Sequence, residues 1–324
     1  MRHDVRITGF ASYLPERMLD NQALPPLDAP IAPAELARIG VHRRGWAAPD
    51  EGIAEMAVAA ARRALARAGV APGELDVVIV ANWTQRRYLP EFAPRVVRLL
   101  GAERAFGHDL GCACTGFLYG VGTACELLRN PRYRRALVVA SEQTSQRARP
   151  GSRGTLILGD GAGAFVLERA SGRGGQLIDY ELACDGSHAQ IMEITDDGWV
   201  HTHIAQRELC ELAAHSIAEL AARLLARNRR TLADVGWVIP HSGTAGVQAA
   251  IVRALGLPAE RILSNFAEVG NVSSASIPVA LDHFVATGQV KPGDLVLSAA
   301  VGGGWYAAAA LYTVMGPGAG ESSS

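Results

Sequence analysis

The sequence predicts an α/β protein made of two related halves, each built around its own sheet. Apolar runs typical of buried strands alternate with segments of helical periodicity, as expected when helices cover both faces of a mostly parallel sheet. The second half of the chain also repeats the first. With 324 residues, of which 49% are hydrophobic and 19% charged, the chain can bury a large core and has a length typical of about two domains.

The first half supplies a helix, a strand and a second helix in close succession. Residues 51–69 have helical periodicity and end in Gly69, a residue type that commonly stops helices. The run LDVVIVAN at 75–82 has a continuously apolar middle, which predicts a buried strand. Residues 91–101 again have the helical pattern.

The second half has the same order, with a helix expected at 207–228 and a strand at 235–241. The repeat has an offset of about 155 to 160 residues for two pairs of segments and about 145 for a third. The pairs are VVRLLG (96–101) with IVRALG (251–256), RRALVVASEQ (134–143) with PGDLVLSAAVG (292–302), and GAGAFVLER (161–169) with WYAAAALYT (305–313). This spacing fits a duplicated α/β half and is too long for a solenoid unit.

The repeat divides the chain into an N-terminal half, residues 1–170, and a C-terminal half, residues 175–315. The Gly-rich, polar stretch 171–176 is the expected join. The small polar tail at 316–324 is expected to be disordered. Two related sheets packed together would leave their strand ends facing a shared crevice, where α/β proteins usually bind ligands.

The charge balance excludes some classes of partner. The 31 basic and 32 acidic side chains leave a formal net charge of −1, which gives no long-range field that attracts phosphate backbones or anionic lipid. We therefore expect neither a nucleic-acid nor a membrane partner. Five cysteines without paired spacing indicate a reducing compartment, and the first ten residues lack the long apolar stretch of a signal peptide. The sequence predicts a cytoplasmic protein.

One uncharged segment, residues 295–314, has a length that could cross a bilayer. Its middle, Gly302-Gly303-Gly304, is better explained as a tight turn between two buried strands. We predict two strands here and no membrane span.

The strongest local signal for chemistry is DLGCACTGFLYGVGTACELL at 109–128. A strand ending near Asp109 turns through small residues into a helix expected to begin near Cys114, and a helix N-terminus favours the thiolate form of such a cysteine. Cys112 and Cys114 form a weak metal signal without further ligands, so no metal site is predicted. The remaining cysteines are interpreted as small buried apolar residues: Cys125, Cys184 and Cys210.

Two further polar residues stand at matching places in the second half. Asn271 follows Gly270 and precedes a predicted helix, so the duplication puts Asn271 opposite Cys114. His241 ends the predicted strand VGWVIPH. A lone histidine at a strand end is more often structural, but a thiol with two neutral hydrogen-bond donors is a constellation for acyl transfer.

These residues lie in motifs of a known family. The chain resembles the β-ketoacyl-acyl-carrier-protein synthase III family of thiolase-fold condensing enzymes, from ITGFASYLPE at 7–16 to ALYTV at 310–314. The motif D-x-x-x-x-C-x-G-F selects Cys114 over Cys112 as the nucleophile. Its matches are Asp109, Cys114, Gly116 and Phe117. Four other features of the family are also matched: the strand-end histidine by His241, GDGAGA at 159–164, G-N-x-S-x-A-S-x-P at 270–278 and the triple glycine at 302–304. We interpret GDGAGA as a structural turn that lines the site.

The resemblance implies a thiolase-like fold, in which the two halves pack as a five-layered α-β-α-β-α sandwich, and a homodimer. It implies that the Cys114 thiolate takes up an acyl group while the main-chain N–H groups of Cys114 and Gly303 form the oxyanion hole. His241 and Asn271 would hydrogen-bond the carbonyl of a malonyl-type thioester, so that loss of CO₂ leaves an enolate that attacks the acyl-cysteine and gives a β-ketoacyl product. No cofactor is implied, and the substrates are acyl thioesters of coenzyme A or acyl carrier protein.

Several positions depart from the family pattern. The family histidine is usually followed by Gln-Ala-Asn and then by an arginine that helps to bind the pantetheine carrier. This chain has Ser242, Gly243 and Thr244 there, with Gly246 at the place of the arginine. The early tryptophan that often stacks on the adenine of coenzyme A is replaced near Ala34. An altered tunnel mouth beside a matching catalytic core suggests a specialised member that acts in secondary metabolism.

Three arginines are candidates for binding coenzyme A or a carrier. Arg38 and Arg153 stand where the family places arginines near the coenzyme A phosphates. Arg207 stands where a small polar residue is common, and it is the nearest replacement in sequence for the missing arginine. Ordinary surface contacts are the alternative explanation for all three.

Three functions compete within the resemblance. Condensation is favoured because Asn271 is retained, and simple acyl transfer to an alcohol or amine has less need of two donors at the second carbonyl. A catalytically silent partner in a heterodimer should lack Cys114. Four bulky residues are candidates for the acyl pocket or a dimer interface, with plain packing as the simpler explanation: Trp83, Tyr88, Leu89 and Phe92.

Overall fold

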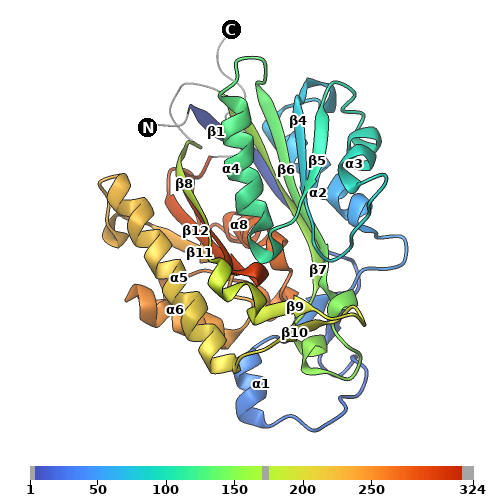
Figure 1. Cartoon of the computed structure of the whole chain (residues 1–324). Helices are drawn as coiled ribbons and strands as arrows, with labels where there is room; N and C mark the ends of the chain where they lie inside the picture. Colours follow the sequence, from blue (N-terminus) through green and yellow to red (C-terminus); the bar gives the residue numbers. More distant parts are fainter. Residues whose placement is uncertain (1–3, 170–174, 316–324) are drawn as a thin grey trace.

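Two mixed sheets stack with helices between them and on both outer sides in the computed structural model, which describes residues 4–169 and 175–315 (Figure 1). The N-terminal sheet has the strand order β1-β7-β6-β4-β5, and the C-terminal sheet has the order β11-β12-β13-β8. The strands are β1 (Val5–Tyr13), β4 (Val77–Ala81), β5 (Phe106–Leu110), β6 (Arg135–Gln143), β7 (Asp160–Arg169), β8 (Leu177–Cys184), β11 (Trp237–Pro240), β12 (Leu295–Gly302) and β13 (Tyr306–Thr313).

Six long helices of the described residues complete a five-layered sandwich. One pair covers the outer face of the N-terminal sheet, a second pair lies between the sheets, and a third covers the outer face of the C-terminal sheet. In that order the pairs are α2 (Ile53–Ala68) with α3 (Phe92–Leu100), α4 (Gly116–Leu128) with α8 (Ser276–Ala286), and α5 (Gln206–Arg227) with α6 (Ala245–Leu255). The predicted α-β-α-β-α architecture is confirmed.

The apolar strands of the N-terminal sheet are buried on both faces, as their continuous apolar runs predict. In β4, Val77, Ile79 and Ala81 pack against the central helices, while Val78 and Val80 pack against the outer helix layer. This alternation follows from the two-residue period of a strand. The middle layer therefore lies in one core shared by both sheets.

Each sheet has the same arrangement of strands, which is the structural form of the sequence repeat. The pairs β4–β6 and β11–β12 are parallel, and the pairs β6–β7, β7–β1, β12–β13 and β13–β8 are antiparallel. A parallel bridge from Val238 to Ile262 stands in the C-terminal sheet where β5 stands in the N-terminal one. The prediction of mostly parallel sheets was wrong, because the last strand of each half, β7 or β13, pairs antiparallel with both of its neighbours.

The similar segments VVRLLG and IVRALG have one role in both halves. Each ends an outer helix, α3 or α6, with a glycine in the left-handed region, φ 78° at Gly101 and 62° at Gly256. Glycine adopts this conformation without the steric penalty of a side chain. Residues 171–174 of the predicted join and the predicted tail at 316–324 lie outside the described residues, so the domain limits stay a prediction.

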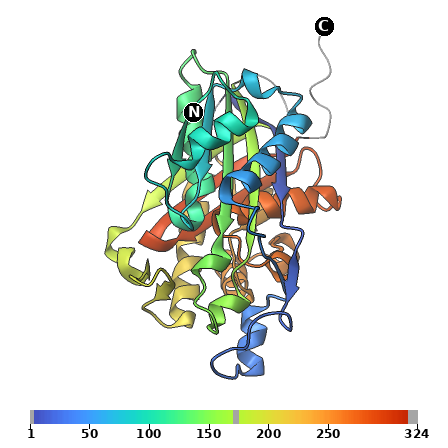
Figure 2. The same cartoon turned by 90° about the vertical axis from the view of Figure 1, so that its right-hand side faces the viewer.

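Smaller elements lie at one end of the molecule. Two small antiparallel sheets are formed by β2 (Met18–Asp20) with β3 (Arg43–Gly45) and by the hairpin of β9 (Met192–Ile194) and β10 (Val200–Thr202). Two short helices are α1 (Pro33–Ile39) and α7 (Phe266–Val269). Figures 1 and 2 both place α1 at the opposite end from the turn between α4 and β6.

The uncharged segment 295–314 forms the two strands that the glycine turn predicts. β12 and β13 pair antiparallel, with Gly302 opposite Tyr306. Among the described residues, no helix combines the length and the apolar character that crossing a membrane requires.

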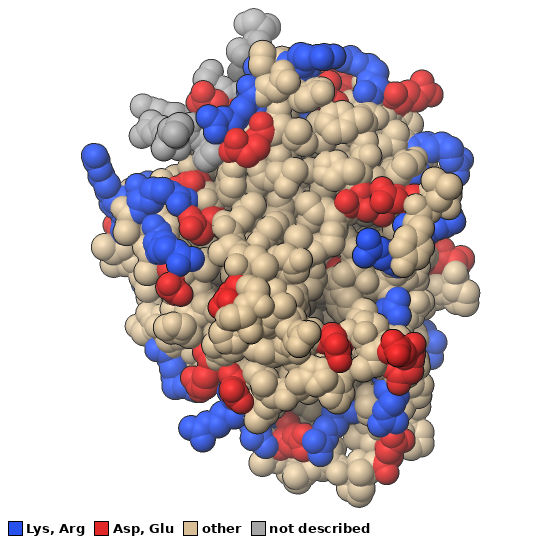
Figure 3. Space-filling view, in the orientation of Figure 1, with Lys and Arg blue, Asp and Glu red and all other residues tan. Residues whose placement is uncertain are grey.

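On the face shown in Figure 3, acidic and basic side chains are interspersed around a largely uncharged middle.

The helix after β5 begins at Gly116, two residues after the predicted start near Cys114, which lies in the 3₁₀ turn Ala113–Thr115 that leads into it. Two other local predictions were wrong. The motif GDGAGA is not a turn, because β7 begins at Asp160 and five of its six residues, including Gly161 and Gly163, lie in that strand. Cys184 is exposed at the end of β8, whereas Cys125 and Cys210 are buried as predicted.

Candidate active site

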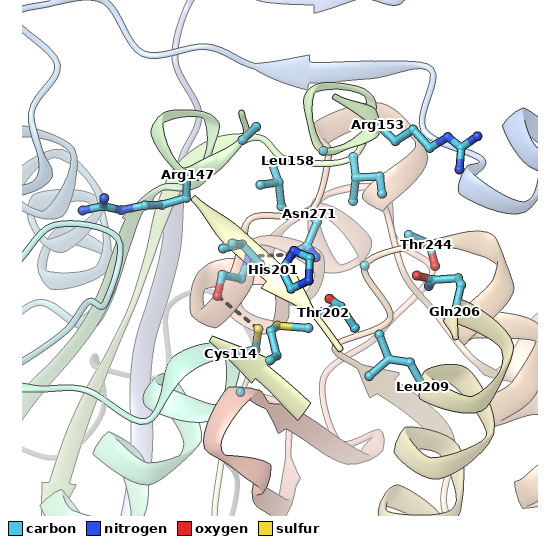
Figure 4. A pocket seen from close by; sticks show the side chains of 18 of the residues that line it. Cys114, Arg147, Arg153, Leu158, His201, Thr202, Gln206, Leu209, Thr244 and Asn271 are labelled. Carbon is cyan, nitrogen blue, oxygen red and sulfur yellow. Dashed lines mark hydrogen bonds between the residues drawn. The ribbon is translucent and has the colours of Figure 1, made fainter. Parts of the chain in front are cut away.

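A pocket of about 740 Å³ opens between the two halves and brings Cys114, His241 and Asn271 together. Cys114 follows β5, His241 follows β11, and Asn271 precedes the short turn that leads into α8. The duplication thus supplies the nucleophile candidate from one half and the two donor candidates from the other (Figure 4). Gly303 also lines the pocket.

Cys114 lies in a tightly constrained turn. The two residues before it, Cys112 and Ala113, have φ of 69° and 47°, a region that non-glycine residues rarely adopt. The Thr115 hydroxyl donates to the Cys112 carbonyl at 2.6 Å and fixes this turn. The end of β12 lies directly against it, because a Cβ at Gly302 would stand only 2.7 Å from the main-chain nitrogen of Cys114.

The Cys114 thiol is protonated at rest. The residue is partly accessible from the pocket, but burial raises the pKa of its thiol to about 11. A hydrogen bond from the Ser273 hydroxyl to Sγ, at 3.3 Å, acts in the opposite direction (Figure 4). The helix N-terminus alone led us to expect a stabilised thiolate, and burial outweighs that effect.

His241 is a neutral donor at ordinary pH. Its main-chain N–H donates to the Ala299 carbonyl at 2.9 Å, which fixes the residue at the end of β11. Burial of the ring lowers its pKa to about 4. The ring atom Nδ1 is buried and has no hydrogen-bond partner in the described part of the chain. A neutral imidazole carries one N–H, which suits it to donate to a carbonyl oxygen.

The side-chain amide of Asn271 is held in one orientation. The main-chain N–H of Ser273 donates to Oδ1 of Asn271 at 2.8 Å, so Nδ2 is left as the donor on the other side. The main chain of Asn271 is fixed as well, because its N–H donates to the Ile157 carbonyl at 2.8 Å and its carbonyl accepts from Gly159 at 3.1 Å. Nδ2 faces Gly243, where a Cβ would approach it to 2.7 Å.

One wall of the pocket is the hairpin β9–β10, which contributes Met192, Val200, His201 and Thr202. His201 lines the same pocket as Asn271 (Figure 4), and its ring packs edge-on against His203 at a centroid distance of 4.7 Å. Arg147 holds the hairpin in place, because it donates to the carbonyl of Gly198 in the hairpin loop at 3.1 Å and to the carbonyl of Thr84 at 2.5 Å.

The three candidate carrier-binding arginines do not gather at the pocket. Arg153 lines it and forms an ion pair with Glu35 at 2.7 Å. Arg38, on α1, and Arg207, on α5, are exposed and lie outside the pocket lining. At Gly246 a Cβ would lie 3.5 Å from both the Arg38 carbonyl and the Cys210 sulfur, so this position faces α1 and α5.

Sequence reasoning missed several residues of this site and overestimated others. Ser273 and His201 were not singled out, although Ser273 stands inside the G-N-x-S motif, and no sequence signal marks His201. Of the four bulky candidates, Trp83 lines the pocket, Phe92 is buried, and Tyr88 and Leu89 are 83% and 93% exposed. No cluster of histidine, cysteine or acidic residues that could hold a metal ion occurs within residues 4–169 and 175–315.

A thiol and two neutral N–H donors, joined in one pocket between duplicated sheets, define a thiolase-fold acyltransferase. Two family models match the chain: 3-oxoacyl-[acyl-carrier-protein (ACP)] synthase III at residues 108–186 and the C-terminal part of the same enzyme at residues 225–314. The chain belongs to the 3-oxoacyl-[acyl-carrier-protein] synthase III family.

Individual relatives agree over nearly the whole chain. The β-ketoacyl-[acyl-carrier-protein] synthase III of Desulfitobacterium hafniense (strain DSM 10664 / DCB-2) is 36% identical, over 96% of this chain and 99% of the relative. The crystal structure of the Aquifex aeolicus VF5 synthase III has a TM-score of 0.89 at 31% identity and covers 95% of this chain and 99% of its own. The priming β-ketosynthase of the R1128 polyketide pathway has a TM-score of 0.88 at 29% identity, with 98% of both chains covered.

Proposed function

We propose that this enzyme condenses an acyl group, carried on Cys114, with a malonyl-type thioester by decarboxylation, and releases a β-ketoacyl thioester. The observation that carries the proposal is the locked amide of Asn271. Because Ser273 N–H occupies Oδ1, Nδ2 remains as the donor of the amide, and both Nδ2 and the neutral ring of His241 lie next to Gly243. Two neutral donors can share the negative charge of an enolate oxygen, which is the charge that decarboxylation creates.

The first half-reaction loads the enzyme. The Cys114 sulfur attacks the carbonyl carbon of an acyl thioester, the C–S bond to the donor thiol breaks, and the proton of Cys114 passes to the departing thiolate. The main-chain N–H groups of Cys114 and Gly303 are the proposed oxyanion hole. The close packing of Gly302 on the Cys114 nitrogen supports this role, since it holds the two chain segments together.

The second half-reaction forms the new carbon–carbon bond. A malonyl-type thioester loses its carboxylate as CO₂, and the electron pair of that C–C bond becomes an enolate held by His241 and Asn271. The enolate carbon attacks the acyl-cysteine, and the Cys114 thiolate leaves and takes up a proton. The step is accelerated because His241 and Asn271 would bind the transition state, in which negative charge develops, more tightly than the ground state.

The substrates are proposed to be thioesters of coenzyme A or of acyl carrier protein. Synthase III relatives are named for the acyl carrier protein, and Arg153 at the pocket offers a cation for a phosphate. The altered stretch Ser242-Gly243-Thr244, with Gly246 at the place of the family arginine, supports a specialised substrate in secondary metabolism.

We further propose that the enzyme is a homodimer whose interface uses the edge strand β5 and the exposed Tyr88 and Leu89. Light scattering during size-exclusion chromatography tests this oligomeric state.

A second candidate function is acyl transfer from Cys114 to an alcohol or amine without decarboxylation. The observation that favours it is His201, an imidazole in the same pocket that could accept the proton of such a nucleophile (Figure 4). His241 is a weak base for that task, because its pKa is lowered to about 4.

The experiment that tests the proposed function starts from the loaded enzyme. The protein is incubated with acetyl-coenzyme A, the mass of acyl-Cys114 is confirmed, and malonyl-coenzyme A or malonyl carrier protein is added. If condensation occurs, the acetyl mass disappears from Cys114, and one CO₂ and one acetoacetyl thioester are formed. Transfer of the acyl group to an alcohol or amine, with no CO₂ from any malonyl thioester, would instead establish the second candidate.

A further inference from the structure

A chain of two hydrogen bonds ends on the sulfur of Cys114. The indole N–H of Trp83 donates to the hydroxyl oxygen of Ser273 at 2.6 Å, and the Ser273 hydroxyl donates to Sγ of Cys114 at 3.3 Å. Trp83 and Cys114 follow strands of the N-terminal half, whereas Ser273 belongs to the C-terminal half. We propose that Ser273 is a catalytic residue that stabilises the Cys114 thiolate, with Trp83 as the positioning residue that directs its proton to the sulfur.

The direction of both hydrogen bonds follows from the chemistry of the groups. An indole N–H can only donate, so the Ser273 oxygen must act as the acceptor toward Trp83. A hydroxyl has one proton, and that proton is then free to point at the sulfur. Ser273 itself is held at φ 49°, in the left-handed region, and its main-chain N–H is engaged by Asn271. The hydroxyl is therefore aimed by its surroundings.

The sulfur needs such a donor. Burial raises the pKa of Cys114, and the nearby Glu142 carboxylate raises it further, whereas the Ser273 hydroxyl lowers it. A hydrogen bond to a charged acceptor is stronger than one between neutral groups. Ser273 therefore favours the thiolate over the thiol. The inference rests on the proposed role of Cys114 as the nucleophile.

Glu142 holds the two donors in place. Its buried carboxylate accepts from the main-chain N–H groups of Trp83 at 3.3 Å and Thr84 at 3.2 Å, and from the Thr84 hydroxyl at 2.9 Å. It also accepts from the Ser274 hydroxyl, next to Ser273. The Glu142 carboxylate thus connects the segment that carries Trp83 to the segment that carries Ser273, and this connection fixes the geometry of the two hydrogen bonds that end on Cys114.

The test measures the rate at which iodoacetamide alkylates Cys114, from pH 6 to pH 11, in the full-length protein. The variants are Ser273→Ala and Trp83→Phe, with labelling mapped by peptide mass and folding checked by circular dichroism. Ser276→Ala is the matched control, because this nearby serine has a buried hydroxyl for which the described residues offer no hydrogen-bond partner. Alkylation needs no acyl substrate, so the readout is independent of the reaction that follows loading.

The alkylation rate should increase with pH as the thiol ionises, and in Ser273→Ala we expect this increase to occur at higher pH. At pH 8, the alkylation rate of Ser273→Ala should be about 4- to 15-fold lower than that of the wild type. Trp83→Phe should shift the profile in the same direction by a smaller amount, and Ser276→Ala should match the wild type. Profiles of Ser273→Ala and Trp83→Phe that superimpose on the wild type would overturn the inference and leave the proposed function intact. Should Cys114 of the wild type fail to react, the proposed function falls, and this inference with it. If Ser273→Ala does not fold, Trp83→Phe decides by the same criterion.

Discussion

The side-chain amide of Asn271 packs directly against the backbone of Gly243. A Cβ at position 243 would stand 2.7 Å from Nδ2 of Asn271 and 3.7 Å from Cε1 of His241, and the backbone there has φ of 71°. Only glycine meets both conditions, because an added side chain would be strained and would displace the amide. In this chain, glycine at position 243 therefore leaves the amide of Asn271 in its observed place.

Gly243→Ala should lower the rate of CO₂ release from a malonyl thioester by about 100-fold or more, a loss expected when one donor to a developing oxyanion is displaced. Loading of Cys114 should change much less. Gly246→Ala is the control, since its Cβ would meet its nearest neighbours at 3.5 Å, an ordinary contact. Equal decarboxylation rates in Gly243→Ala and the wild type would show that the amide position does not matter.

Cys114 and Cys112 should differ in acylation. Burial raises the pKa of both thiols to about 11, but the Ser273 hydroxyl reaches only Cys114 among the described contacts. Incubation with an acyl thioester should add one acyl mass to the wild type and to Cys112→Ala, and none to Cys114→Ala. An acyl adduct that persists in Cys114→Ala would assign the nucleophile to another residue.

The buried ring of His241 should make the fold sensitive to acid. Its pKa is about 4 in the folded protein against an ordinary value of 6.5, so between these values the unfolded chain binds a proton that the folded chain does not. Stability should therefore fall as the pH is lowered through this window, by at most about 3 kcal/mol at pH 4 from this group. Glu142 acts in the opposite direction, because its pKa is raised to about 7 and the folded carboxyl holds its proton longer.

A comparison of wild type with His241→Gln isolates the histidine. Urea unfolding of both proteins at pH 7.5 and pH 4.5 should show a smaller loss of stability in the variant, since glutamine does not titrate. The same loss in both proteins would mean that His241 is not buried as a neutral ring.

Delivery of the second substrate should depart from the family's usual route. A charge-assisted contact from arginine is worth roughly 1.5–3 kcal/mol, so its absence at Gly246 predicts about 10- to 150-fold weaker use of a malonyl carrier protein of fatty-acid synthesis. Turnover is compared for that carrier, a pathway-specific carrier and malonyl-coenzyme A, in the wild type, Gly246→Arg and Gly246→Ala. The prediction fails if the wild type uses the fatty-acid carrier as well as an ordinary family member does and Gly246→Arg changes nothing.

The repeated segments were enough to predict the two stacked halves, and Gly69 and Gly101 marked the ends of α2 and α3 within a residue. Strand direction was not predictable in the same way, because it depends on where β7 and β13 return and not on their apolar pattern. The motif matches pointed to Cys114, His241 and Asn271, and all three line one pocket in the structure.

The details that control reactivity could not be predicted from the pattern. The raised pKa of Cys114 comes from burial by residues distant in sequence, and the donors Trp83 and Ser273 are brought to it from different halves. Arg207 was the nearest candidate in sequence terms to replace the missing arginine, at a position where a small polar residue is common. The first turn of α5 leaves Arg207 exposed, while Gln206 and Leu209 line the pocket.

The most direct test of the central claim is the release of CO₂ from a malonyl thioester by Asn271→Asp. This change keeps the size of the side chain and replaces the N–H donor with a second acceptor oxygen, which repels an enolate. The account predicts that Asn271→Asp still forms the acyl-Cys114 adduct with acetyl-coenzyme A at a rate near that of the wild type, while CO₂ release falls by about 100-fold or more. Undiminished CO₂ release by Asn271→Asp, or a wild-type enzyme that transfers acyl groups and never releases CO₂, would contradict it.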